Sequence, residues 1–119
     1  MSKVKKMQNY LLKLPKRYAY ALCKLKCGNH NMPIVTGRYS KVPINERKCN
    51  LCQCGDIGDE FHYLLKCPFF EAARTKYLKT YYYTHPSRVK MQQLFESTDS
   101  IEILNLAKLS VVLLNQFKK

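Results

Sequence analysis

Four side chains of metal-binding type, at a characteristic spacing, constrain this chain more than any other feature. Cys49 and Cys52 form a C-x2-C pair, and His62 and Cys67 follow after nine and four intervening residues. The tight pair directs two sulfur atoms at one point, and the second pair completes the tetrahedral geometry of closed structural zinc sites. We therefore predict one structural Zn2+ held by these four residues. A catalytic zinc needs an open coordination position, which four protein ligands fill.

The segment from His62 to Cys67 has to change direction if both residues are to reach one ion. Five positions along an α-helix correspond to a rotation of about 140°, so a helix that begins at Glu60 must end before Cys67. Pro68 supplies this break, because proline moves the preceding residue out of the α region. Asp59 and Glu60 precede His62, where we expect them to complement the helix dipole; a hydrogen bond from one of them to the imidazole is the alternative.

The other cysteines admit further pairings. Cys54 can replace Cys52 through a C-x4-C pairing, although the tighter spacing favours Cys52. Cys23 and Cys27 lie four residues apart on a predicted helix and therefore share a face. With His30 they offer three ligands of a second metal site, but a fourth ligand is missing. We expect these two cysteines to be packed free thiols, as is common for cysteine.

The N-terminal region does not have the pattern of a secretory signal. Asn9, Lys13 and Lys16 interrupt any apolar run there, and no run in the chain approaches the roughly 20 residues of a membrane-spanning helix. Clustered Cys and His in such a chain favour metal binding over disulfides. We therefore expect reduced thiols, a nuclear or cytoplasmic location and no membrane span.

Apolar spacing predicts an all-α fold in a chain about one domain long. Helices are expected at 3–14, 16–27, 60–65, 69–83, 88–96 and 101–117. Gly28 and Asn29 end the second of these helices, and Asp99 with Glu102 three residues later forms a capping box at the last. The predicted arrangement is a small helical domain around one structural zinc site: basic helices (1–29), an irregular basic connector (30–48), the zinc site (49–68) and C-terminal helices (69–119).

Two segments allow more than one interpretation. In the connector, Pro33, Gly37 and Pro43 separate short stretches with β-branched residues, which favours extended chain with a short strand or two. The helix at 101–117 has an apolar stripe too broad for a lone surface helix. We expect that helix to form the core, and pairing with a partner helix or with a second copy of this chain is the alternative.

Positive charge is concentrated in the first part of the chain. The net charge is +13, and residues 1–45 contain ten Lys or Arg and no acidic residue. Such a field attracts polyanions, with nucleic acid as the first candidate partner and an anionic membrane surface as the second. The candidate phosphate contacts flank the zinc loop: Lys16, Arg17, Lys24, Lys26, Arg38, Lys41, Arg47 and Lys48. The candidate side chains for stacking on unpaired bases are Tyr39, Tyr81, Tyr82 and Tyr83. A solvated basic face with core tyrosines is the alternative.

A longer pattern surrounds the four predicted ligands. It consists of Gly37-Arg38-Tyr39, Pro43-Ile44, Arg47-Lys48-Cys49, Cys52, Asp59-Glu60-Phe61-His62-Tyr63-Leu64 and Cys67-Pro68. This pattern resembles the C-terminal cysteine–histidine region of LINE-type (non-LTR) retrotransposon reverse transcriptases. The segment 17–31 is similar to the basic helix that precedes that region, and Arg74 and the apolar last helix fit the sequence that follows it. The resemblance covers roughly residues 15–119.

The resemblance implies a zinc-binding module that contacts template RNA or target DNA, attached in the parent protein to a reverse transcriptase body. It also implies that Cys49, Cys52, His62 and Cys67 are the zinc ligands. The chain contains no Tyr-x-Asp-Asp polymerase signature and no acidic cluster suited to a two-metal nuclease, so we expect no enzymatic activity. His30 and His85 have no nucleophile beside them in any recognisable pattern. The alternative function is a zinc-stabilised helical adaptor that binds a partner protein through residues 101–117.

Overall fold

The computed structural model describes residues 14–117, and the predicted helix at 3–14 lies outside them except for Leu14. The described part of the chain is all-α, as the sequence predicts. Within it no β-strand forms, and the only pairing of extended chain is an isolated antiparallel bridge between Lys48 and Ile57. No helix in this part is long and apolar enough to cross a membrane.

Six α-helices and three shorter helical turns follow one another along the described chain. The α-helices are α2 (Lys16–Cys27), α3 (Pro33–Tyr39), α4 (Glu71–Tyr77), α5 (Thr80–Tyr83), α6 (Arg88–Phe95) and α7 (Ser100–Gln116). The shorter turns are the 3-10 turn η1 (Ile44–Glu46), the π-helical turn η2 (His62–Lys66) and the 3-10 turn η3 (Pro68–Phe70).

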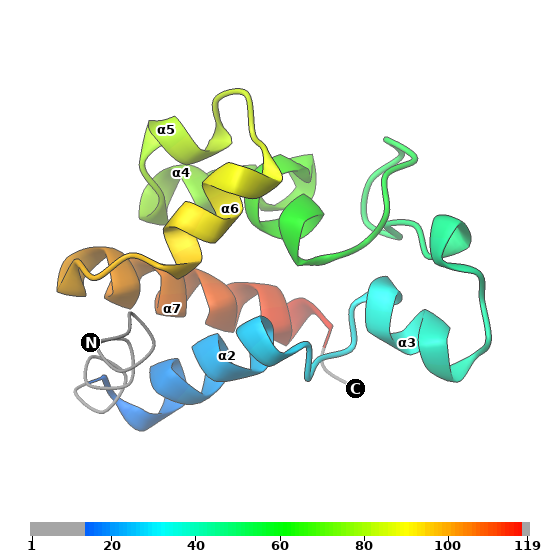
Figure 1. Cartoon of the computed structure of the whole chain (residues 1–119), viewed down its shortest axis with the longest axis horizontal. Coiled ribbons are helices and arrows are strands. Elements are labelled where there is room, and N and C mark those ends of the chain that lie inside the picture. Colours follow the sequence, from blue (N-terminus) through cyan, green and yellow to red (C-terminus); the bar gives the residue numbers. More distant parts are fainter. Residues whose placement is uncertain (1–13, 118–119) are drawn as a thin grey trace.

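Helix α7 occupies the middle of the molecule. It packs against α2 on one side and α4 on the other, so that α2 lies below it and α4–α6 above it in Figure 1. Its side chains Leu106, Leu109 and Leu113 are almost completely buried. They join one continuous core with side chains of α2, η2 and α4–α6. The prediction that residues 101–117 form core is therefore confirmed.

The two helix termini that the sequence marks most clearly, the end of α2 and the start of α7, lie where the sequence predicts them. Helix α2 ends at Gly28, which has a left-handed backbone (φ 72°), and Asn29 N donates to Lys24 O at 2.9 Å. This left-handed cap satisfies carbonyl groups that the last turn leaves unpaired. At the start of α7, Asp99 Oδ1 accepts a hydrogen bond from Ile101 N at 3.0 Å.

The second interaction of the predicted capping box, from the Glu102 side chain back to Asp99 N, does not form, so this part of the prediction is wrong. Asp99 N donates to Ser97 Oγ at 3.3 Å, and the Glu102 carboxylate lies elsewhere. It accepts a hydrogen bond from the Tyr82 hydroxyl at 2.8 Å and pairs with Lys79 Nζ at 3.0 Å. A contact between helices has therefore replaced the local one.

The irregular connector at 30–48 is also a wrong prediction, because it contains α3 and η1. Pro33 stands at the first position of α3, where a missing N–H costs nothing and the fixed φ favours the helix. Position 37, within α3, requires glycine because the Arg47 side chain passes over it. A Cβ there would lie 2.5 Å from Arg47 Cγ. Both residues serve the helix and its packing, although the sequence suggested that they interrupt it.

The single helix predicted at 69–83 is divided. The chain forms η3 and α4, leaves the helical conformation at Leu78 (ψ 149°) and Lys79 (ψ 144°), and resumes as α5. Leu78 is 6% exposed and belongs to the core. Burial of that side chain and of Tyr82 outweighs the local preference for a continuous helix. The predicted start of the next helix at residue 88 is confirmed. Helix α6 begins after Ser87, whose Oγ accepts a hydrogen bond from Lys90 N.

Candidate metal centre

A short hairpin-like loop presents the first two cysteines. Cys49 N donates to Asp56 O at 2.9 Å, and Gly58 N donates to Arg47 O at 2.8 Å, on either side of the Lys48–Ile57 bridge. Between these contacts the chain turns at Gly55, whose backbone is left-handed (φ 78°). The loop brings the two sulfur atoms of the C-x2-C pair 3.5 Å apart.

The second pair of side chains is brought together by a widened helical turn. Cys67 N donates to His62 O at 2.7 Å, a bond that spans five residues and defines the π turn η2. Cys67 itself is extended (ψ 122°), as expected from the proline that follows it. The sequence therefore predicted the change of direction, but not the π turn, a form that is frequent at functional sites.

Arg74 of α4 holds this turn in place. Its Nε donates to Leu64 O at 2.6 Å, and its Nη2 donates to Tyr63 O at 3.0 Å and to Cys67 O at 2.8 Å. The side chain is buried, with 4% of the residue exposed. Carbonyl groups at the end of a helical turn lack hydrogen-bond partners within the turn. Here the guanidinium group of Arg74 donates to three such carbonyl groups.

The four predicted ligands converge in the structure. The three thiols and the imidazole each offer one ligand atom, and these atoms all lie within 4.8 Å of one another. Cys49 Sγ lies 3.8 Å from Cys67 Sγ, and Cys52 Sγ lies 3.3 Å from His62 Nε2. A tetrahedral ion with metal–sulfur bonds of about 2.3 Å and a metal–nitrogen bond of about 2.0–2.1 Å would set these separations at about 3.8 and 3.6 Å.

Polar atoms around the cluster also fit a bound cation. Leu51 N donates to Cys49 Sγ at 3.3 Å, and such a bond favours the thiolate over the thiol. All six cysteines are free thiols, so no disulfide competes for the sulfur atoms. The residues present can therefore hold one metal ion with four protein ligands.

The protonation of the ligands depends on their burial. Burial, together with the neighbouring Cys49 sulfur, raises the pKa of the Cys67 thiol to about 12. Burial lowers the pKa of His62, although Asp56 and Asp59 oppose this effect, so the imidazole is neutral and free to coordinate. Without a cation the Cys67 thiol stays protonated; a bound divalent ion reverses this preference and releases its proton.

Asp56 is the carboxylate nearest the ring of His62. Its Oδ2 lies 3.5 Å from His62 Nδ1 and 3.4 Å from Lys66 Nζ. The sequence offers Asp59 or Glu60 for this place only as the alternative to their interaction with the helix dipole. Asp56 lies beside the ring because the hairpin-like loop closes. A carboxylate at the second nitrogen orients a metal-bound imidazole and leaves Nε2 for the ion.

The two acidic residues before His62 stabilise the start of its helix and its surroundings. Asp59 Oδ1 accepts from His62 N at 2.9 Å, which is the predicted interaction with the helix terminus. Asp59 Oδ2 pairs with Arg88 Nη2 at 3.0 Å. Glu60 Oε2 lies 2.5 Å from His30 Nε2, and Met32 N donates to His30 Nδ1. These contacts tie the loop after α2 to the metal-binding segment.

The remaining cysteines lie outside the cluster. Cys54 is exposed, so the alternative pairing in which it replaces Cys52 finds no support. Cys23 and Cys27 are also exposed, with their sulfur atoms 3.9 Å apart, and the prediction that they are packed is wrong. They point away from the core because Ala21, Leu22 and Leu25 form the buried side of α2. The ring of His30 is held by its own hydrogen bonds and does not complete a second site.

The eight basic candidates divide into two groups. Two of them take part in the fold: Lys26 Nζ donates to Phe95 O at 2.7 Å, and Arg47 donates to Val42 O and Ile34 O. Burial lowers the pKa of Lys26 to about 8. Of the other six side chains, Lys24 is half-buried and five are exposed: Lys16, Arg17, Arg38, Lys41 and Lys48.

The aromatic candidates also differ in access. Tyr39 is 80% exposed, Tyr81 is 53% exposed and Tyr82 is buried against Glu102. Tyr83 is half-buried beside the core. The sequence did not single out Tyr20, which is 64% exposed on α2. Its position off the apolar stripe that contains Leu25 could have indicated that the Tyr20 ring is exposed.

Comparison of the sequence with models of known protein families, with curated proteins and with solved structures gives no significant match in any of the three.

Proposed function

We propose that this chain is a zinc-stabilised nucleic-acid-binding module, and that the zinc has a structural role. Three thiolates and one imidazole in a tetrahedron are the ligands and the geometry that zinc prefers. Four protein ligands leave no position for a substrate, which supports a structural ion and no catalysis at the metal. The convergence of Cys49, Cys52, His62 and Cys67 is the observation that carries the zinc part of the proposal.

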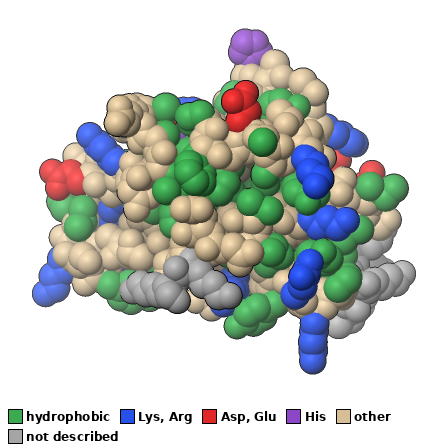
Figure 2. Space-filling model, turned by 180° about the vertical axis from the view of Figure 1, so that it is seen from behind, with side chains coloured by type: hydrophobic (Ala, Val, Ile, Leu, Met, Phe, Trp, Pro, Cys, Tyr) green, Lys and Arg blue, Asp and Glu red, His purple; other side chains and the backbone are tan. Residues whose placement is uncertain are grey.

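The distribution of charge supports nucleic acid as the partner. Four of the eight acidic residues are taken up by internal ion pairs, namely Asp56 with Lys66, Asp59 with Arg88, Glu60 with His30 and Glu102 with Lys79. Within residues 14–117, no acid pairs with Lys16, Arg17, Lys24, Arg38, Lys41 or Lys48. Lys and Arg side chains outnumber Asp and Glu over the face shown in Figure 2, and several gather at one end. Such a surface recruits phosphates and releases their counterions.

The proposed origin of the module follows from the resemblance described above. A LINE-type reverse transcriptase would place this segment after its polymerase, where it would contact template RNA or target DNA. The reverse transcriptase body is then the partner in the parent protein, and the nucleus or cytoplasm is the compartment in which its thiols stay reduced. The adaptor alternative depended on the apolar face of α7, and α2 and α4 cover most of that face.

Salt dependence of binding tests the nucleic-acid part. We expect the zinc-loaded protein to bind RNA, single-stranded DNA and duplex DNA with affinity that falls steeply with salt. Each neutralised phosphate contributes about −0.7 to the slope of log K against log salt on single strands and about −0.9 on duplex DNA. Fluorescence anisotropy at a series of salt concentrations gives the slope, and about five contacts would make it about −3.5 on a single strand.

A matched pair of double variants separates local contacts from net charge. Arg38→Gln with Lys48→Gln removes two candidate contacts, whereas Lys76→Gln with Lys90→Gln removes the same charge on the α4–α6 side. The first pair should flatten the slope by about one to two units, and the second should leave it nearly unchanged. Binding that is insensitive to salt, or equal loss in both pairs, would contradict the proposed contact surface.

A further inference from the structure

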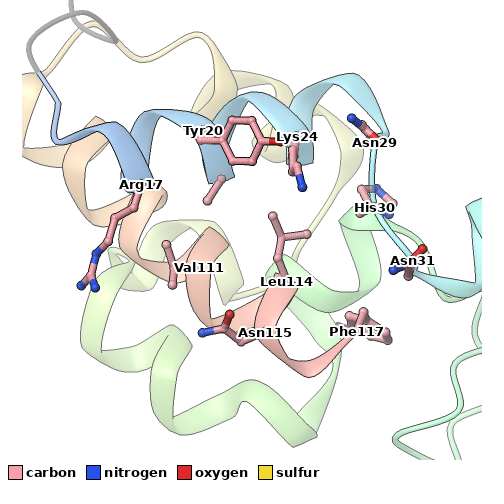
Figure 3. A pocket seen from close by; sticks show the side chains of 11 residues that line it. Arg17, Tyr20, Lys24, Asn29, His30, Asn31, Val111, Leu114, Asn115 and Phe117 are labelled. Carbon is pink, nitrogen blue, oxygen red and sulfur yellow. The ribbon is translucent and has the colours of Figure 1, made fainter. Parts of the chain in front are cut away.

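A cavity of about 440 Å³ opens between α2, the loop that follows it and the C-terminal half of α7. Figure 3 shows α2 above it and α7 below it, with the residues 29–31 closing one end. Cavities that hold small organic groups typically measure about 300–1,000 Å³. The site is separate from the metal cluster, whose four ligands do not line it.

The charged side chains of this cavity are both cationic. Arg17 and Lys24 line it from α2, and no Asp or Glu is among the described residues that line it. They are seven residues apart, which is two helical turns or about 10.5 Å along the same face. A phosphate-bearing chain that runs along α2 can therefore meet both side chains while it passes the cavity.

The walls combine an aromatic ring with aliphatic side chains. Tyr20 lies on the α2 side, exposed, and Lys24 Nζ lies 4.5 Å from the centre of its ring. Val111 and Leu114 lie opposite on α7 (Figure 3). A flat, weakly polar ring inserted between these side chains would bury both faces, as nucleobases do when they stack on aromatic residues.

The ends of the cavity carry amide side chains. Asn29 and Asn31 lie at one end and Asn115 at the rim on α7 (Figure 3). Each amide offers two N–H donors and one carbonyl acceptor, which matches the mixed donor and acceptor edge of a nucleobase. His30 also lines the cavity, but Glu60 and Met32 N occupy its ring nitrogens.

We propose that this cavity binds one unpaired nucleotide of a single strand, with the base between Tyr20 and α7 and its flanking phosphates on Arg17 and Lys24. Charge attracts the backbone, and the apolar walls and amides select a base-bearing strand over other anions. The inference rests on the proposed function and adds the form of nucleic acid and the place where it binds.

The test compares two probes of equal charge. One is a labelled single-stranded DNA oligomer, and the other has the same length but consists only of abasic sugar–phosphate units. At one salt concentration we expect the zinc-loaded protein to bind the base-bearing strand about tenfold more tightly, because stacking of a single base contributes an effect of this size. A poly-glutamate peptide of equal charge serves as a third probe.

Two neighbouring residues of α7 provide a matched pair of variants. Val111→Trp fills the cavity, whereas Val112→Trp adds the same ring on an exposed side of the helix that does not line it. The first should lose the tenfold preference and the second should keep it, with circular dichroism and zinc content showing that both fold. Asn115→Ala, a smaller change at the exposed rim, should weaken the preference without the risk of a larger side chain.

Every outcome decides between the proposals. Equal affinity of the wild-type protein for both strands overturns the base-binding cavity while salt-dependent binding to both still supports the proposed function. A preference that survives in Val111→Trp also overturns it, because the base then binds elsewhere. Tighter binding of poly-glutamate points to an acidic peptide instead, and failure of all three probes to bind removes both proposals.

Discussion

Single side chains in this molecule carry interactions that connect distant parts of the chain. Arg74 donates to the carbonyl groups of Tyr63, Leu64 and Cys67 from a helix that begins after the metal-binding segment. Asp56 reaches His62 from the hairpin-like loop that carries Cys49 and Cys52. The ligand set alone therefore does not define the centre, because its geometry depends on side chains that bind no metal.

Replacing Arg74 should cost far more than replacing its neighbours. Arg74→Met leaves three buried carbonyls without a donor, and we expect the free energy of unfolding of the metal-loaded protein to fall by about 3–5 kcal/mol. Arg74→Lys keeps one donor and should cost less. Urea denaturation measures both, with Lys76→Met on the exposed side of α4 as the control, expected within about 0.5 kcal/mol of wild type. A loss as small as that of the control would show that water satisfies the carbonyls.

At the scale of helices, contacts between elements decide where local preferences are followed. Helix α7 keeps its N-terminal cap on Asp99, yet its Glu102 turns to α5 and accepts from Tyr82. Burial alone raises the pKa of Glu102, but the hydrogen bonds from Lys79 and Tyr82 outweigh it and hold the pKa below its ordinary value. This carboxylate thus joins two layers of the fold.

The lowered pKa of Glu102 fixes the sign of a pH effect. Its contribution is complete above the pKa of the unfolded chain, near 4.5, and is lost as the pH falls through the lower folded value. Glu102→Gln should therefore destabilise the protein by about 1–2 kcal/mol at pH 7 and by less at pH 3–4. Urea denaturation at both pH values checks this, with Glu71→Gln as the control on an exposed site. An equal loss at both pH values would mean that the charge of Glu102 is not what matters.

For the molecule as a whole, the candidate metal centre and the hydrophobic core are one unit. Tyr63, Leu64, Leu65 and Cys67 belong to the same continuous core as the buried leucines of α7. Loss of a bound ion would leave four ligand side chains at the edge of that core without their common partner. A structural zinc contributes on the order of 10–16 kcal/mol in small domains, and a domain of this kind is stable by about 5–15 kcal/mol.

Removing the metal should therefore unfold the chain. Chelation, or Cys67→Ser, is expected to abolish the helical circular-dichroism signal, whereas Cys54→Ser should leave it unchanged because Cys54 is exposed outside the cluster. Elemental analysis of the purified protein should find one zinc per chain. A compact, helical protein with no bound metal would contradict the proposed structural role.

The sequence by itself determined the features that depend on a few neighbouring residues. The spacing of Cys49, Cys52, His62 and Cys67 predicted which side chains converge, and Gly28 and Asp99 marked the ends of α2 and α7. Each pair of ligands and each helix cap depends on the geometry of one turn, which the local sequence specifies.

Only the tertiary structure decided the rest. The helix at Pro33–Tyr39, the break at Leu78, the hydrogen bonds of Arg74 and the cavity between α2 and α7 all depend on packing between residues far apart in the chain. Burying Leu78 and Tyr82, or making room for Arg47 above Gly37, changes the free energy by more than local propensity does. These packing free energies arise only when the distant residues are in contact, so a single stretch of sequence does not predict them.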